Sequence, residues 1–353
     1  MGLLLLHVMN GLLLLLMNNE RGMSREIHII SRKTFHAIIE SIMNNVIILL
    51  GPTCVGKTGL SILIAKALKT EIISADSMLV YKHMDIGTAK PSDEELKTVP
   101  HHLIDILSPS QTFSAGQFKE RATAIIHSLH ARDKIPVITG GTGLYIRSLT
   151  KGLFEGPGAD DSLRKTLKEE AEIQGSDYLY TKLETIDPEA ARRIDKNDVR
   201  RLIRALEVSL KSPQGISELR KNSTVPLHYD FIKIGLTRDR NELYPMIEQR
   251  VDRMMQSGLL EETKQLLTFS PGKTALQALG YKEIMLFMHG TVDLAEAVRL
   301  MKKRTKEYAK RQFTWFKKEP DIHWVDITGV RDSRAIYTMV LNKVEILKDL
   351  IYS

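Results

Sequence analysis

The stretch NVIILLGPTCVGKT at positions 45–58 decides the predicted fold. Residues 45–50 form a continuous apolar run rich in β-branched side chains, which is typical of a strand buried on both faces. Residues 51–58 fit the pattern G-x-x-x-x-G-K-[ST] at every fixed position, and a helical pattern follows over 59–68. A strand, a glycine-rich turn and a helix in this order predict a loop whose backbone N–H groups bind phosphate.

The residues of this predicted phosphate loop have distinct expected roles. The Lys57 ammonium can reach a terminal phosphate, and the Thr58 hydroxyl can bind Mg²⁺. The pattern indicates a polyphosphate, but it does not distinguish ATP from another one. The predicted diphosphate or nucleotide set is Gly51, Pro52, Thr53, Cys54, Val55, Gly56, Lys57 and Thr58.

Strand and helix patterns alternate along most of the chain. Further strands are predicted at 71–75, at the start of 134–149, at 230–239 and at 322–327, with helical patterns between them. This alternation predicts an α/β fold, a P-loop doubly wound and mostly parallel sheet with ligands at the carboxyl ends of its strands. Residues 159–226 consist of short helical segments broken by Gly, Asp-Pro and Asn-Asp, which predicts an all-helical insertion domain.

A chain of 353 residues is long enough for about two domains. We expect a catalytic core in two parts, 43–158 and 227–353, with the insertion at 159–226 between them. Residues 1–42 contain an apolar block that is short for a membrane-spanning helix, so we expect no membrane partner and an extension outside the folded core. The single cysteine, Cys54, excludes an internal disulfide and fits a cytoplasmic location.

Two side chains at predicted strand ends are candidate catalytic groups. Asp76 follows the strand at 71–75, so its carboxylate is expected over the same crevice as the phosphate loop. It can act as a base, a metal ligand or only the cap of the next segment. Thr142 lies in a glycine-rich turn, where its hydroxyl can hold a phosphate or orient a nucleophile; a turn that needs glycine only for its conformation is the alternative.

Two segments have the composition of polyanion-binding surfaces, in a chain with 50 basic and 43 acidic residues. Residues 297–318 contain nine Lys or Arg and one Glu, with four aromatic residues interleaved, which suits RNA. The alternative is a solvated helix face whose aromatic rings pack into the core. In the insertion, Arg200 and Arg204 share a helix face and can bind phosphate or form salt bridges with Asp198 or Glu207.

Seven motifs together resemble one family. GPTCVGKT, ISADSMLVYKHMDIGTAKP, ITGGTGLYI, NDVRRLIRALEV, IEQRV, ALGYKE and KRQFTWF have the order and spacing of the tRNA dimethylallyltransferase family, from about residue 45 to residue 326. The resemblance implies transfer of a dimethylallyl group from dimethylallyl diphosphate to N6 of adenosine 37, in tRNAs that read codons beginning with U. The products are N6-(dimethylallyl)adenosine and diphosphate.

The resemblance also implies site residues. Asp76 matches the carboxylate that takes the N6 proton, and Thr142 matches a hydroxyl near the reacting centre. Arg250 matches the arginine that supports the diphosphate, and Mg²⁺ is the expected cofactor, with Thr58 as its ligand. The expected tRNA contacts are Asp76, Ser77, Met78, Leu79, Thr142, Arg164, Arg200, Arg201, Leu202, Ile203, Arg204, Gln277, Gly280, Tyr281, Lys282, Lys310, Arg311, Gln312, Phe313, Thr314, Trp315, Phe316 and Lys317.

Two rival functions share part of this pattern. An adenylate isopentenyltransferase that makes free cytokinin has the loop and the Asp, but typically lacks the long segments that grip tRNA. A small-molecule P-loop kinase needs neither the basic segment at 297–318 nor the insertion. We therefore expect the anticodon stem-loop of tRNA and dimethylallyl diphosphate as partners of a monomeric enzyme.

Overall fold

The computed structural model describes residues 2–9, 12–18, 26–30, 44–154 and 156–352. The chain forms two compact units, one made of the chain up to Ile146 together with His228–Ser353, the other of Arg147–Leu227. The second unit begins at Arg147 rather than at residue 159. Its entry and exit segments are tied together, because Leu227 N donates to Leu149 O and Phe154 pairs with Thr224.

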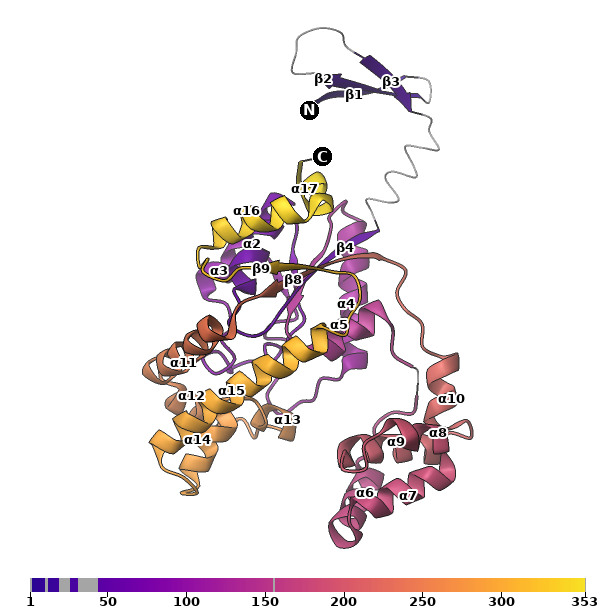
Figure 1. Cartoon of the computed structure of the whole chain (residues 1–353), viewed down its shortest axis with the longest axis vertical. Coiled ribbons are helices and arrows are strands. Elements are labelled where there is room, and N and C mark those ends of the chain that lie inside the picture. Colours follow the sequence, from indigo (N-terminus) through magenta and orange to yellow (C-terminus); the bar gives the residue numbers. More distant parts are fainter. Residues whose placement is uncertain (1, 10–11, 19–25, 31–43, 155, 353) are drawn as a thin grey trace. The chain divides into compact units, whose positions relative to one another are not determined.

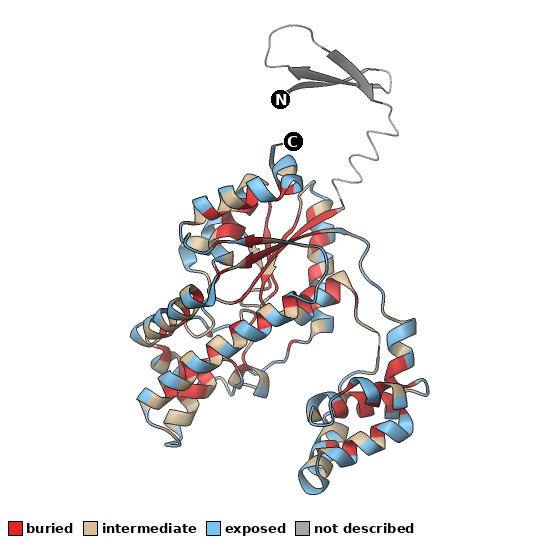
Figure 2. Cartoon of the chain, in the orientation of Figure 1, coloured by how far each residue is buried: buried red, intermediate tan, exposed pale blue. Residues whose placement is uncertain are grey.

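The first unit is built on a six-stranded sheet in the order β6-β5-β7-β4-β8-β9, in which every neighbouring pair is parallel. The predicted α/β fold with a parallel sheet is confirmed. β4 is central and buried along its whole length (Figure 2). The strands are β4 (Asn45–Leu50), β5 (Ile72–Ser74), β6 (His101–His102), β7 (Val137–Gly140), β8 (Asp230–Thr237) and β9 (Ile322–Asp326).

Helices connect these strands (Figure 1). Several begin with side-chain caps; in α4 the Ser114 and Gln117 side chains form a reciprocal capping box. The helices are α2 (Lys57–Ala67), α3 (Asp93–Thr98), α4 (Ala115–His130), α5 (Gly143–Thr150), α11 (Arg240–Gln256), α12 (Leu259–Thr268), α13 (Lys273–Leu276), α14 (Tyr281–Met288), α15 (Leu294–Phe316), α16 (Ser333–Lys343) and α17 (Glu345–Tyr352).

One hydrophobic cluster joins β4 to α2 and α16. Ile47 and Leu49 contribute from the strand, two residues apart and therefore on the same face. Leu60 and Ile64, one helical turn apart on α2, and Val340 of α16 complete the contact, and all five side chains are fully buried. Burying such side chains is worth about 1.5–3 kcal/mol each, which fixes α2 and the phosphate loop before it against the sheet.

The second unit is a small bundle of helices. Its core is mostly leucine and alanine; Leu167, Leu183, Leu202 and Leu206 belong to it, all essentially without exposed surface. The buried Asp187 side chain caps α8 by accepting a hydrogen bond from Ala190 N. The helices are α6 (Asp161–Gln174), α7 (Ser176–Ile186), α8 (Pro188–Arg193), α9 (Val199–Lys211) and α10 (Gly215–Asn222).

The described part of the extension forms a sheet of its own. β1 (Gly2–Met9), β2 (Leu12–Asn18) and β3 (Glu26–Ile30) pair antiparallel in that order. Residues 19–25 and 31–43 lie outside the described residues, so the expectation that 1–42 stands apart from the folded core stays a prediction. Among the described helices, none is both long and apolar enough to span a membrane.

Candidate active site at the carboxyl edge of the sheet

The phosphate loop joins β4 to α2 and is shaped by two glycines. Gly51 has φ 148° and Gly56 has φ 106°, backbone conformations that residues with a Cβ rarely adopt. A Cβ on Gly51 would also lie 2.7 Å from Leu236 O on the neighbouring strand. α2 begins at Lys57 without a side-chain cap, so the N–H groups of its first turn are available to bind an anion.

The Lys57 side chain lies over this loop. Its Nζ donates to Gly51 O and to Pro52 O, both at 2.8 Å. Burial lowers the pKa of Lys57 to about 8, and the nearby Asp76 carboxylate opposes this shift. The ammonium is thus held at the anion site by two neutral carbonyl oxygens. A bound phosphate can replace them as its hydrogen-bond acceptor.

Two segments distant in sequence hold Thr53, in the middle of the loop. Arg250 of α11 donates from Nη2 to Thr53 Oγ1 at 2.7 Å. Thr53 N donates to the Gln312 side-chain oxygen of α15 at 2.8 Å. The structure therefore brings the predicted Arg250 to the phosphate loop, so that an anion in the loop lies beside two cationic side chains.

Asp76 follows β5 at the same edge of the sheet. Its Oδ1 accepts a hydrogen bond from Met78 N at 2.8 Å, so one carboxylate oxygen shapes the turn. The side chain is half-buried, and its charge acts on Lys57; burial raises the pKa of Tyr308, and the Asp76 charge adds to that rise. Capping the turn and facing the phosphate loop are therefore compatible roles for Asp76.

Thr142 joins the turn after β7 to the turn after β5. Its Oγ1 accepts from Ser77 N at 3.0 Å and donates to Ser77 Oγ at 3.4 Å. The hydroxyl thereby fixes the residue that follows Asp76. Gly140 allows this approach, because a Cβ there would lie 2.3 Å from Ala75 O.

The donor set suits a divalent cation that arrives with a phosphate ligand. Thr58 lies on the first turn of α2 with its side chain exposed. In the part of the chain that the structure describes, no group of three or more His, Cys, Asp or Glu could hold a metal ion by itself. Mg²⁺ fits a single hydroxyl ligand here, because it commonly takes its remaining ligands from phosphate and water.

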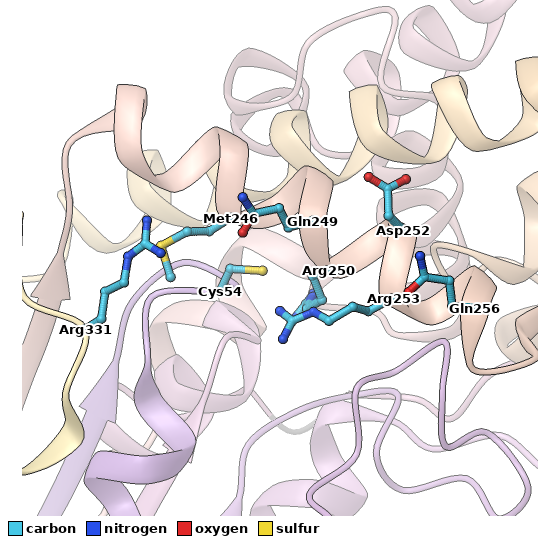
Figure 3. Close-up of a pocket in the computed structure, with 8 residues that line it drawn as sticks. All are labelled: Cys54, Met246, Gln249, Arg250, Asp252, Arg253, Gln256 and Arg331. Carbon is cyan, nitrogen blue, oxygen red and sulfur yellow. The ribbon is translucent and has the colours of Figure 1, made fainter.

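A cavity of about 530 Å³ opens beside the phosphate loop (Figure 3). Its lining is strongly basic, because three arginines come from α11 and from the loop before α16. It is large enough for a small anionic ligand with an apolar tail. The lining residues are Cys54, Met246, Gln249, Arg250, Asp252, Arg253, Gln256 and Arg331.

Residues 79–319 match the family model described as IPP transferase. The chain is 53% identical over 298 residues to the tRNA dimethylallyltransferase of Thermodesulfovibrio yellowstonii, a match that covers 82% of this chain and 94% of that protein. This chain belongs to the IPP transferase family.

Solved structures agree with this membership. One is the full-length tRNA isopentenylpyrophosphate transferase from Bacillus halodurans, with 39% identity and a TM-score of 0.63, covering 88% of this chain and 100% of that one. Another is a eukaryotic dimethylallyltransferase acting on tRNA, with 29% identity and a TM-score of 0.72, covering 86% of this chain and 77% of that one.

In this IPP transferase, the predicted tRNA-binding residues fall into three classes of exposure. Those with exposed side chains are Arg200, Arg201, Gln277, Lys310, Arg311, Thr314 and Lys317. Those that are partly buried are Asp76, Ser77, Met78, Leu79, Thr142, Arg164, Ile203, Arg204, Lys282, Phe313 and Trp315. Those that are buried are Leu202, Gly280, Tyr281, Gln312 and Phe316. Contact of this set with tRNA stays a prediction.

The aromatic residues of α15 mostly pack against protein rather than offering stacking surfaces. Phe316 is fully buried. Trp315 lies so close to Gly143 that a Cβ there would come within 2.3 Å of the indole ring. Phe313 meets the Trp324 ring edge to face at 5.6 Å between centroids. Phe316 therefore belongs to the core, whereas stacking of the partly buried Phe313 and Trp315 on RNA stays a prediction.

The arginines of the second unit divide between ion pairs and solvent. Glu207 is fully buried and accepts hydrogen bonds from Arg164 at 2.9 Å and from Arg204 at 2.5 Å. Burial by itself would raise the pKa of Glu207, but the hydrogen bonds from Arg164, the Asp160 backbone and Arg204 lower it. Arg204 thus follows the salt-bridge alternative, whereas Arg200 is exposed.

Glu262 is a structural residue that the sequence patterns did not reveal. Its carboxylate accepts from the backbone N–H groups of Asp85, Ile86 and Gly87 at 2.8–3.1 Å, and from Tyr281 Oη at 2.6 Å. This arrangement anchors the loop that follows Asp76 to α12 and α14. An acidic residue in an amphipathic helix gives no local signal of such a role, because most are solvated.

Proposed function

We propose that this chain transfers a dimethylallyl group from dimethylallyl diphosphate to N6 of adenosine 37 in tRNAs that read codons beginning with U. The products are N6-(dimethylallyl)adenosine and diphosphate. The observation that carries the proposal is the meeting of Lys57, Arg250 and Asp76 at one edge of the sheet. Two cations face a leaving diphosphate, while a carboxylate stands where the acceptor amine must approach. The names of the relatives support the substrates.

Asp76 serves the nucleophile. The exocyclic amine of adenine is conjugated with the ring and is a poor nucleophile, so removal of its proton as the bond forms assists the reaction. One oxygen of Asp76 is engaged with Met78 N, which orients the carboxylate and leaves the other to accept the N6 proton. The new bond joins N6 to the allylic carbon as the bond from that carbon to the diphosphate oxygen breaks.

The phosphate loop serves the leaving group. Negative charge accumulates on the diphosphate as the allylic carbon becomes carbocation-like. The N–H groups at the start of α2, the Lys57 ammonium and the Arg250 guanidinium stabilise this charge. Mg²⁺ bound through Thr58 would supply further positive charge to the same oxygens.

The exposed cations serve the RNA. Lys310, Arg311 and Lys317 at the end of α15 and Arg200 on α9 present positive charge to the anticodon stem-loop. The target base must leave its stack to reach Asp76, at a cost of about a few kcal/mol. Cytoplasmic location and a monomeric state belong to the same proposal.

One experiment separates this function from its rivals. The full chain is incubated with radiolabelled dimethylallyl diphosphate and either unmodified tRNA or AMP, with Asp76→Asn as the matched control. Label is expected in tRNA, at the position of adenosine 37, and only at trace level in the control. Label in AMP alone would identify an adenylate isopentenyltransferase. In a parallel incubation with labelled ATP, phosphate transfer without prenylation of tRNA in the first assay would identify a kinase.

A further inference from the structure

Gln312 is buried within the most basic stretch of the chain. Only 5% of its surface is exposed, although Lys310 and Arg311 beside it are exposed. Its Oε1 accepts from Thr53 N at 2.8 Å, and its Nε2 donates to Gly141 O at 2.9 Å. The orientation of the amide is fixed by its partners, since a backbone N–H can only donate and a carbonyl can only accept.

The two partners belong to the two halves of the candidate site. Thr53 lies in the phosphate loop, and Gly141 directly precedes Thr142 in the turn after β7. The contact is close, because a Cβ on Gly141 would lie 2.0 Å from Gln312 Nε2. One side chain therefore spans the space between the loop and the turn, and glycine is the only residue that leaves room for it.

We propose that Gln312 is a positioning residue, which sets the distance between the phosphate loop and the Thr142 turn. The inference rests on the proposed function, which assigns the diphosphate to the phosphate loop and the acceptor amine to the side of the Thr142 turn. Loss of the amide leaves the part-buried Thr53 N–H and the buried Gly141 carbonyl without this partner, and their reorganisation displaces the loop. Through Gln312 the same helix that presents cations to RNA also supports the diphosphate site.

Gln312→Met tests this, because methionine has similar length and no amide. The matched control is Thr305→Val, because Thr305 is a buried polar residue on α15 whose hydroxyl donates within the helix, to Met301 O. Three quantities are measured: affinity for inorganic diphosphate by calorimetry, hydrogen exchange of the peptide that contains Thr53, and affinity for tRNA. For Gln312→Met we expect diphosphate affinity to fall about tenfold, the usual effect of leaving one hydrogen-bond donor without a partner. We also expect faster hydrogen exchange in the peptide that contains Thr53.

We expect tRNA affinity of Gln312→Met to stay within about twofold of wild type, since the side chain is buried, and Thr305→Val to change none of the three quantities. Unchanged diphosphate affinity with weakened tRNA binding would overturn the proposal, because it would make Gln312 an RNA contact. Equal effects of Gln312→Met and Thr305→Val on diphosphate affinity would also overturn it, by showing general loosening of α15.

A second set of variants keeps the test decisive if Gln312→Met folds poorly. Gly141→Ala introduces the colliding Cβ and should weaken diphosphate binding about as much as Gln312→Ala does. When Gly141→Ala is combined with Gln312→Ala, the Cβ no longer meets the amide. The second substitution should therefore reduce diphosphate affinity by less than about a further twofold. If the two substitutions together reduced diphosphate affinity by the product of their separate factors, a direct link between Gln312 and Gly141 would be refuted. If the wild type failed to prenylate tRNA, the proposed function would fall, while diphosphate affinity and exchange would still decide the role of Gln312.

Discussion

Arg250 donates a hydrogen bond from Nη2 to Oγ1 of Thr53 at 2.7 Å, across 197 residues of sequence. The contact exists because β8 pairs with β4 in parallel, so that α11, which follows β8, starts at the edge where the phosphate loop lies. A guanidinium in this place meets an anion in the loop without further movement of the backbone. The relationship supports a diphosphate site assembled from both parts of the first unit.

Lys57 gives the diphosphate site a pH dependence. Its pKa of about 8 means that the ammonium is charged below that pH and loses its charge above it. Affinity for inorganic diphosphate should therefore decline as pH rises through about 8. Lys57→Ala should weaken binding by roughly 10- to 100-fold at pH 7, the worth of a charged hydrogen bond, while tRNA still binds.

Calorimetric titrations measure this effect between pH 6.5 and 9.5, about one and a half units on each side of the Lys57 pKa. Lys57→Ala is the reference, because diphosphate itself titrates equally in both proteins. Lys57→Arg is the second control, because its guanidinium stays charged throughout. A wild-type profile parallel to that of Lys57→Ala would contradict the role of the ammonium.

Asp76→Asn separates proton abstraction from turn formation. Asparagine keeps an oxygen that can accept from Met78 N, so the turn should survive. Turnover with tRNA should fall by about 10²–10⁴, the usual contribution of a general base, whereas diphosphate affinity should change little. Single-turnover kinetics measure the first quantity and calorimetry the second.

The alternatives for Asp76 predict other outcomes. A near-normal rate for Asp76→Asn, with a slow Asp76→Ala, would assign the residue to the turn alone. Recovery of the rate of Asp76→Asn by added Mg²⁺ would instead make the carboxylate a metal ligand.

Arg200 and Arg204 should respond differently to alanine substitution. Arg200 is exposed, so Arg200→Ala should reduce the slope of log tRNA affinity against log salt by about 0.7–0.9 for one phosphate contact, without loss of stability. Arg204 pairs with the buried Glu207, which keeps Arg164 as a second partner, so Arg204→Ala should lower the free energy of unfolding of the second unit by about 1.5–3 kcal/mol, the worth of a charged hydrogen bond. Salt-dependent filter binding and thermal unfolding distinguish them, and identical salt slopes and stabilities for the two variants would refute this division.

Glu71 should make the first unit sensitive to acid. The carboxylate is 7% exposed and accepts hydrogen bonds from Arg132 at 2.7 Å and Lys134 at 2.9 Å. Burial opposes ionisation, but these bonds, with one to His102, bring the pKa of Glu71 down to about 2. A lowered pKa contributes stability above the unfolded value of 4.5, which is lost as pH falls through the folded value.

The contribution is about 3 kcal/mol, and it should disappear between about pH 4.5 and pH 2. The measurement is the free energy of unfolding by urea across that range, compared with Glu71→Gln, whose profile should be flatter there. Parallel profiles for the two proteins would show that Glu71 is not the group that titrates.

Local chemistry is what the sequence determined by itself. The phosphate loop can be predicted from the sequence because its glycines, its lysine and the start of its helix all lie within one short segment, Gly51–Thr58. Asp76 and Thr142 are predictable for a related reason: side chains that follow parallel strands gather at one edge of the sheet. These inferences need only the order of the elements.

Tertiary structure decided which polar side chains face solvent and which join distant segments. Arg204 and Arg200 lie on one helix with the same residue type, yet only packing against Glu207 makes the first an internal partner. Gln312 stands among cations typical of an RNA surface, yet it faces Thr53 and Gly141. The physical reason is that amides and guanidiniums are compatible with both water and buried hydrogen-bond partners, so the packing of the elements decides which they meet, whether the partner lies on the same helix, as for Arg204, or 259 residues away, as Thr53 does from Gln312.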